Sequence, residues 1–311
     1  METSCAIDPQ ASADHSDSAA ATLAVMLDRK LVFVSGKGGV GKSAVTASLA
    51  LLASRRGLRV LAVGMVEGLG LAGHFGVDRL GYSPSQVRSG TEALTVYRDE
   101  ALDEYLRLQL HVPRATPTKI LTRALDVLAE TAPGIREIVT IGKPVYELWQ
   151  SRYDLVLVDA PPLGQLFSYL RAPNTIADLV PAGPIQRQAN HMRESLADSE
   201  LTSLVLVTTP EELPVLETRA TLDRIAVEPV ITLDAVVVNR LLNALPIDAE
   251  ILGDLPEGPH RAAAEHHLTT YRQQQRWLQA VESELHLPYL FGLHTAGEVA
   301  EQMADVWDEL I

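Results

Sequence analysis

Cysteine is almost missing from this chain of 311 residues, since Cys5 is the only one. A single cysteine excludes an intramolecular disulfide and a metal site built from several cysteines of one chain. We therefore expect a reducing, cytoplasmic setting.

Long apolar runs are missing too. No stretch approaches the roughly 20 apolar residues that a membrane-spanning helix needs. The first residues are acidic and lack the basic start and apolar centre of a secretory signal. We expect a soluble protein with no transmembrane segment, whose membrane contact is only peripheral or through a partner.

Positive charge is in short supply, with 26 lysines and arginines against 40 acidic residues and a net charge of −14. The phosphates of DNA and RNA are repelled by such a surface. We expect no nucleic-acid partner.

The length fits a single α/β domain with one large sheet. Residues 1–28 are rich in Ala, Ser and Asp without a clear pattern, which predicts a mobile tail. Residues 29–311 form the predicted domain, with a helical insertion at about 100–150. Within the insertion an apolar face is expected for core packing or for an apolar client, from Ile120, Leu121, Ala124, Leu125 and Leu128.

A phosphate-binding motif organises the chain. The apolar strand at residues 31–35 runs into G-K-G-G-V-G-K-S at residues 36–43, and a helix is predicted at 44–56. In this motif backbone N–H groups surround phosphate oxygens, Lys42 reaches the β/γ-phosphates and the Ser43 hydroxyl binds Mg²⁺. The expected nucleotide contacts are Gly36, Lys37, Gly38, Gly39, Val40, Gly41, Lys42, Ser43 and Ala44.

A carboxylate follows another apolar strand, predicted at residues 153–158. Asp159 stands at the carboxyl end of that strand, where an acidic residue holds Mg²⁺ in phosphate-loop proteins. We expect Ser43 and Asp159 at the metal, and a cap on the following helix is a second role open to Asp159.

Strands and helices alternate along the chain, which predicts a doubly wound, mainly parallel sheet of the P-loop NTPase type. Further strands are expected at 59–64, 91–98, 203–208 and 231–239. Further helices are expected at 211–227 and 260–285, with a terminal helix ending at Ile311.

The second loop lysine, Lys37, resembles the deviant Walker A class. That resemblance implies a dimer in which Lys37 reaches the partner's nucleotide, whereas a plain loop lysine is only a solvated cation. P-E-E-L-P-V-L-E-T-R at residues 210–219, V-V-V-N-R at 236–240 and D-A-P-P-L-G at 159–164 resemble the ArsA-like ATPases. The paired ArsA-like subunits of actinobacteria have the strongest resemblance.

Further site residues follow from this resemblance. It implies that Gly164 offers a backbone N–H to the γ-phosphate, that Asn239 contacts adenine and that residues 289–293 close over the base. Asn239 is equally suited to a turn at the end of a strand.

Several positions depart from the family pattern. Hydrolytic members carry D-P-A-H after the second strand, where this chain has Val66 and Glu67, and Gln165 replaces a histidine. Valine can neither orient nor deprotonate the attacking water. The metalloid-binding and zinc-binding cysteines of the family are missing as well.

Three functions remain open on these residues. The first is an ATP- and Mg²⁺-dependent ATPase that works with a second ArsA-like subunit and hydrolyses weakly alone. The second is a competent homodimeric ATPase in which Glu67 positions water, and the third is a nonhydrolytic regulatory subunit. Lys37 and Glu67 are the candidate catalytic residues, and a DNA-partition ATPase is disfavoured by the charge.

Overall fold

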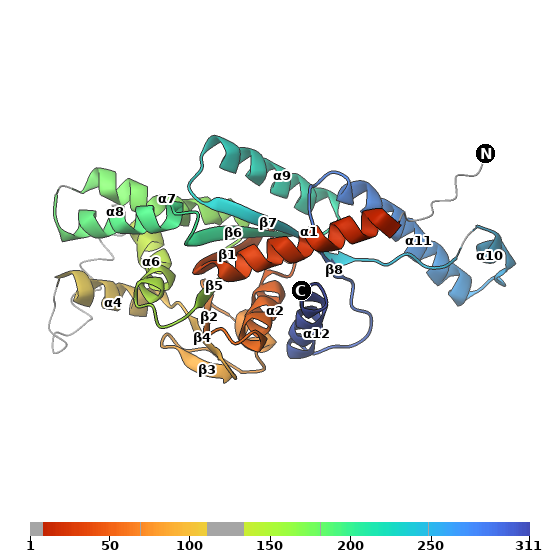
Figure 1. The fold of residues 1–311 in the computed structure, drawn as a ribbon, viewed down its shortest axis with the longest axis horizontal. Helices are drawn as coiled ribbons and strands as arrows, with labels where there is room; N and C mark the ends of the chain where they lie inside the picture. Colours follow the sequence, from red (N-terminus) through yellow and green to blue (C-terminus); the bar gives the residue numbers. More distant parts are fainter. Residues whose placement is uncertain (1–8, 69, 111–133, 181, 248) are drawn as a thin grey trace.

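The computed structural model describes residues 9–68, 70–110, 134–180, 182–247 and 249–311. These residues contain one sheet of eight strands in the order β3-β4-β2-β5-β1-β6-β7-β8. Only the β3–β4 pair is antiparallel. The predicted α/β fold with a doubly wound, mainly parallel sheet is confirmed (Figure 1).

The strands are β1 Leu31–Gly36, β2 Val60–Gly64, β3 Ser85–Arg88, β4 Thr91–Thr95, β5 Leu155–Asp159, β6 Thr202–Thr208, β7 Thr232–Leu241 and β8 Leu285–Pro288. The helices are α1 Pro9–Asp28, α2 Lys42–Arg55, α3 Gly70–His74, α4 Arg98–Leu110, α6 Ile135–Trp149, α7 Leu163–Leu179, α8 Pro184–Ala197, α9 Glu212–Val227, α10 Ala249–Asp254, α11 Pro259–Leu278 and α12 Ala296–Asp308.

Both faces of the central strands are covered by helices. In β1, Val32 and Val34 pack into the core formed with α1, α2 and α12. Leu31 and Phe33 point to the other face, where α6, α7 and α8 pack. Burial on both faces explains why β1 is a continuous apolar run without polar alternation.

The N-terminal segment differs from the predicted mobile tail. Residues Pro9–Asp28 form α1, which lies along the sheet (Figure 1). Ala19, Leu23 and Met26 are buried, and their spacing of four and three places them on one face of the helix. This short apolar stripe fixes a segment whose overall composition resembles a flexible chain.

The insertion is described in part, as α4 and α6. Buried Lys143 of α6 joins the two helices, because its ammonium lies 3.1 Å from Glu104 of α4 and 3.0 Å from Glu147. Residues 111–133, including the predicted apolar face from Ile120 to Leu128, lie outside the described part.

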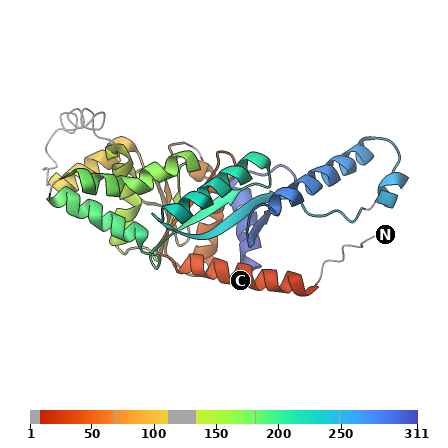
Figure 2. The same cartoon turned by 90° about the horizontal axis from the view of Figure 1, so that it is seen from above.

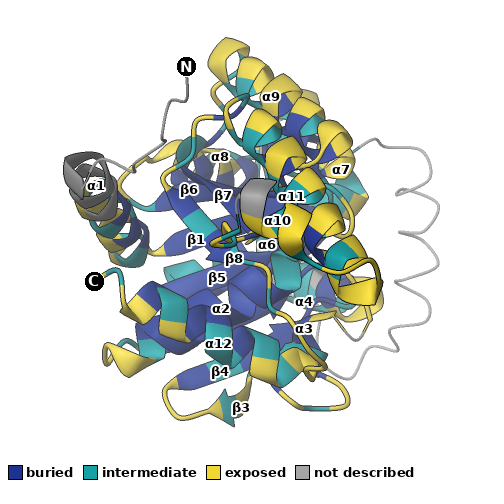
Figure 3. Ribbon diagram, turned by 90° about the vertical axis from the view of Figure 1, so that its right-hand side faces the viewer, coloured by how far each residue is buried: buried dark blue, intermediate teal, exposed yellow. Residues whose placement is uncertain are grey.

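The region after β7 forms an arm. Helix α11 buries only Ala264 and Gln274 (Figure 3) and extends past the end of the sheet (Figure 2). It ends at Leu278, seven residues before the predicted boundary, because the chain turns to enter β8 at Leu285. Among the described helices, none is long and apolar enough to span a membrane.

Candidate functional site

The phosphate loop leaves the carboxyl end of β1, in the middle of the sheet. A Cβ atom on Gly36 would come within 2.1 Å of the Val207 carbonyl oxygen. Gly41 has φ 98°, a left-handed conformation that favours glycine, and a Cβ atom there would come within 2.4 Å of Asn239 Nδ2. Packing therefore requires glycine at position 36, and packing and backbone conformation both favour it at position 41.

The middle of the loop is open. Cβ atoms on Gly38 and Gly39 would meet no atom within 4 Å. Val40 and Ala44 are buried on the other side and fix the loop to the core. The side of the loop at Gly38 and Gly39 is therefore not covered by other parts of the described chain.

Both loop lysines have partners within the chain. Lys42 Nζ donates a 3.2 Å hydrogen bond to the Lys37 carbonyl oxygen. Burial lowers the pKa of Lys42, and the nearby charge of Asp159 opposes this shift. The Lys37 ammonium forms an ion pair with Glu217 of α9.

Ser43 and Asp159 meet across two neighbouring strands. Asp159 ends β5, which pairs with β1, and Ser43 Oγ donates a 2.6 Å hydrogen bond to Asp159 Oδ2. Burial raises the pKa of Asp159 to about 6, although Ser43 and Lys42 oppose the shift. Helix α7 begins after Pro162 without a side-chain cap, so Asp159 does not take the alternative capping role.

This pair of groups fits Mg²⁺ in its chemistry. Carboxylate and hydroxyl oxygens are hard ligands of the kind that Mg²⁺ prefers. A buried carboxylate with a raised pKa also lacks sufficient positive charge nearby, and a bound cation favours its ionised form.

Asn239 lies against the phosphate loop. Its Nδ2 donates a 2.8 Å hydrogen bond to the Val40 carbonyl oxygen, and its Oδ1 accepts one of 2.9 Å from the Arg240 N–H. Arg240 has φ 61°, which is unusual for a residue with a side chain. Gln274 Nε2 of α11 supports this conformation by donating to the Arg240 carbonyl oxygen. The predicted contact of Asn239 with adenine stays a prediction.

The residues that depart from the family pattern lie together. Val66, Glu67 and Gln165 line one cavity of about 590 Å³, which also borders α4 and α6. Val66 is 55% exposed. Gly164 lies in the first turn of α7, and a Cβ atom there would meet nothing within 4 Å. The Cβ position of Gly70, after β2, lies 3.0 Å from Ser43 Oγ, so this segment reaches the loop.

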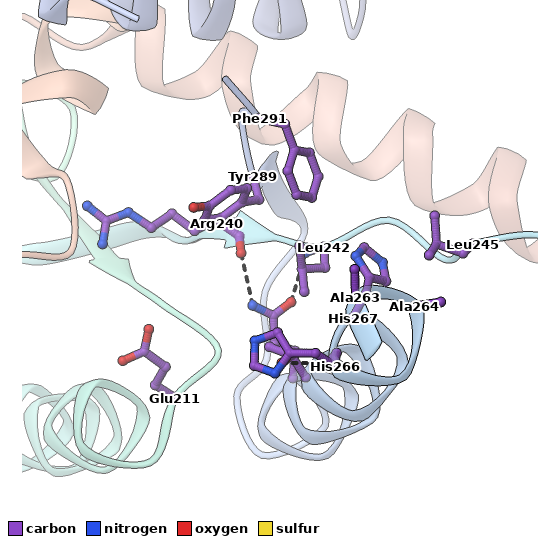
Figure 4. Close-up of a pocket in the computed structure, with 12 residues that line it drawn as sticks. Glu211, Arg240, Leu242, Leu245, Ala263, Ala264, His266, His267, Tyr289 and Phe291 are labelled. Atoms are coloured by element: carbon purple, nitrogen blue, oxygen red, sulfur yellow. Dashed lines mark hydrogen bonds between the residues drawn. The ribbon is translucent and has the colours of Figure 1, made fainter. Parts of the chain in front are cut away.

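Two cavities flank Arg240. One of about 330 Å³ is lined by Asn239, Pro288 and residues of the predicted base-closing segment. The other, of about 750 Å³, lies between α11 and the chain after β8, with the rings of His267, Tyr289 and Phe291 on its wall (Figure 4). The segment predicted to close over the base, residues 289–293, therefore lies between two cavities.

Sequence reasoning missed the partners of these residues. Glu217 was expected only as part of the family stretch at residues 210–219. Its pairing with Lys37 could not be predicted, because the two residues lie far apart in the sequence. The role of Gln274 could not be predicted from the sequence either, because a glutamine on a polar helix resembles an exposed glutamine. Only the structure shows its two hydrogen bonds to the 240–242 segment.

Comparison with known proteins identifies the family of this chain. The sequence model of the ArsA ATPases, described as anion-transporting ATPases, matches residues 29–183 and 182–254. ATPase BagA of Mycobacterium tuberculosis is 32% identical over 226 residues, which cover 69% of this chain and 66% of that protein. A putative arsenical pump-driving ATPase of Halobacterium salinarum is 27% identical over 226 residues, 67% of this chain and 35% of that protein.

A eukaryotic relative matches as well. ATPase get3 of Schizosaccharomyces pombe is 29% identical over 150 residues, which cover 47% of this chain and 44% of that protein. The matched part spans less than two thirds of each of these three relatives. The family model matches well over half of the residues of this chain. The chain therefore belongs to the ArsA family of anion-transporting ATPases.

Proposed function

We propose that this chain binds ATP with Mg²⁺ and hydrolyses it to ADP and phosphate, in a dimer with a second ArsA-like subunit. The observation that carries the proposal is the 2.6 Å contact between Ser43 and Asp159 beside Lys42. A hydroxyl, a buried carboxylate and a loop ammonium meet at one edge of the sheet, and that combination suits a metal-bound triphosphate.

The proposed roles follow from these positions. The N–H groups of residues 36–44 and the Lys42 ammonium bind phosphate, while Ser43 and Asp159 hold Mg²⁺. Bound Mg²⁺ supplies positive charge that offsets the charge developing on the phosphates. Gly164 contributes a backbone N–H at the start of α7. The proposed setting is the cytoplasm, without a nucleic-acid partner.

Weak hydrolysis by the isolated chain is the second part of the proposal. Val66 has no group that accepts a proton from water or orients it. Lys37 is nevertheless present, and the resemblance to the deviant Walker A class supports a role for it at the other subunit's nucleotide. The subunit thereby completes its partner's site while its own works slowly.

Glu67 supports one competing function. It lines the same cavity as Val66 and Gln165. A backbone shift of one residue would put its carboxylate in the place of the family's aspartate, where it can position water. In that case the chain is a competent homodimeric ATPase. A nonhydrolytic regulatory subunit is the other candidate, because both Val66 and Gln165 lack the chemistry of the family's switch residues.

Two measurements test the proposal. Calorimetric titration with Mg-ATP is expected to show binding that Lys42→Ala and Ser43→Ala each weaken strongly, with unchanged circular dichroism. Unchanged affinity in both variants overturns the site. Phosphate release by the lone chain, and then with an ArsA-like subunit copurified from native lysate, separates a partner-dependent ATPase from a competent homodimer and from a nonhydrolytic subunit.

A further inference from the structure

The parallel sheet brings α9 to the phosphate loop. Strand β6 pairs with β1, with Gly36 beside Val207, so both strands end at the same edge. The loop follows β1 and α9 follows β6 by a short turn. Glu217, in the second turn of α9, thereby reaches Lys37 over a separation of 180 residues.

The structure shows a resting arrangement in which the loop's cations are bound by the chain itself. Lys37 pairs with Glu217, and Lys42 Nζ donates a hydrogen bond to the Lys37 carbonyl oxygen. Lys37 therefore contributes to both contacts, one through its side chain and one through its backbone.

We infer that Glu217 is a positioning residue that keeps Lys37 within its own subunit until a nucleotide in the dimer draws the lysine away. This inference rests on the proposed function, because it concerns the same lysine. The Lys37 ammonium can occupy only one position at a time. While it is paired with Glu217, it cannot contact a nucleotide across a dimer interface.

The strength of the ion pair suits a reversible contact. The side chains of Lys37 and Glu217 are 29% and 44% exposed, so water screens their attraction. An exposed pair of this kind changes an equilibrium by roughly fivefold or less. A triphosphate carries several negative charges and forms stronger charge-assisted hydrogen bonds, so it displaces Glu217.

A matched pair of variants isolates this contact. Glu217→Gln removes the charge that faces Lys37 and keeps the shape of the side chain. Glu212→Gln makes the same change in net charge in the first turn of the same helix, on a side chain that takes no part in the Lys37 ion pair. Any general effect of net charge is common to both, and circular dichroism of the two variants checks that α9 stays folded.

The state of Lys37 is read directly by NMR of ¹³C-methylated lysines. The chain has only five lysines, at positions 30, 37, 42, 119 and 143, and Lys37→Arg assigns the signal. We expect the Lys37 signal of the nucleotide-free protein to shift and narrow in Glu217→Gln and to stay unchanged in Glu212→Gln. An unchanged signal in Glu217→Gln overturns the resting pair, whatever the protein does with ATP.

Assembly tests the release of Lys37. With Mg²⁺ and a non-hydrolysable ATP analogue, sedimentation velocity is expected to show that Glu217→Gln assembles at up to roughly fivefold lower protein concentration than the wild type or Glu212→Gln. Equal assembly in all three proteins overturns the positioning role. Absence of calorimetric binding of the analogue in all three overturns the proposed function instead, and the NMR result still decides the pair.

Discussion

Asn239 Nδ2 donates a 2.8 Å hydrogen bond to the Val40 carbonyl oxygen, so the end of β7 holds the phosphate loop from behind. Asn239 is 1% exposed. Its Nδ2 lies 2.4 Å from where a Cβ atom on Gly41 would be, so this close contact depends on glycine at position 41. The contact indicates that Asn239 acts on the loop, apart from any contact with a base.

Asn239→Ala separates these two roles. Loss of the hydrogen bond leaves the Val40 carbonyl without its partner, which costs about 1–3 kcal/mol. If Asn239 positions the loop, the variant loses the same factor in affinity for Mg-ATP and for inorganic tripolyphosphate. Calorimetry with both ligands checks this, with exposed Asn243→Ala as control. A loss confined to ATP contradicts loop positioning and favours the contact with adenine.

Asp159 predicts a pH dependence of stability. Its pKa is raised from 3.8 to about 6, so the folded nucleotide-free protein binds this proton more tightly than the unfolded chain does. The contribution of this group to stability is present below about pH 4 and is lost as the pH rises through about 6, a change of roughly 3 kcal/mol.

Asp159→Asn removes that dependence. We expect the free energy of unfolding of the variant, relative to the wild type, to increase between pH 4 and pH 7 and then to level off. Urea titrations across this range measure it, with exposed Asp178→Asn as control. Added Mg²⁺ is expected to stabilise the wild type at pH 7 and to have less effect on Asp159→Asn. A difference that does not change with pH contradicts the assignment.

The sequence was sufficient for the sheet and the loop for a physical reason. Strands buried on both faces are unbroken apolar runs, and the phosphate motif requires glycine at fixed positions, so β1, β5 and the loop were each visible locally. Contacts between distant elements were not visible. The pairing of Lys37 with Glu217, and of Asn239 with Val40, depends on which strands are neighbours, and periodicity carries no information on that order.

Helix α1 is a segment whose structure the composition predicted wrongly. Its composition predicted a tail, yet Leu23 is fully buried against the sheet. Leu23→Ala is therefore expected to reduce the free energy of unfolding by about 2–5 kcal/mol. Val25→Ala, at a position 46% exposed on the same helix, is expected to change it by less than about 0.5 kcal/mol. If urea titrations show equally small effects for Leu23→Ala and Val25→Ala, the prediction of a mobile tail is supported instead.

Val66 supports the most specific prediction about catalysis. It is 55% exposed beside Glu67 and Gln165, so an aspartate is accommodated there without burying a charge. We expect slow phosphate release by the lone chain, and an increase of about 10²-fold in Val66→Asp, because a carboxylate then orients the attacking water and accepts its proton. Val66→Asn, which has a similar shape but no base, is the control. Calorimetric affinity for Mg-ATP is expected to stay the same in both variants, which separates catalysis from binding.

Glu67→Gln is expected to leave the slow rate of phosphate release by the lone chain unchanged. Fast release by the unmodified lone chain that disappears in Glu67→Gln contradicts this account, since the water is then positioned by Glu67 in a competent homodimer.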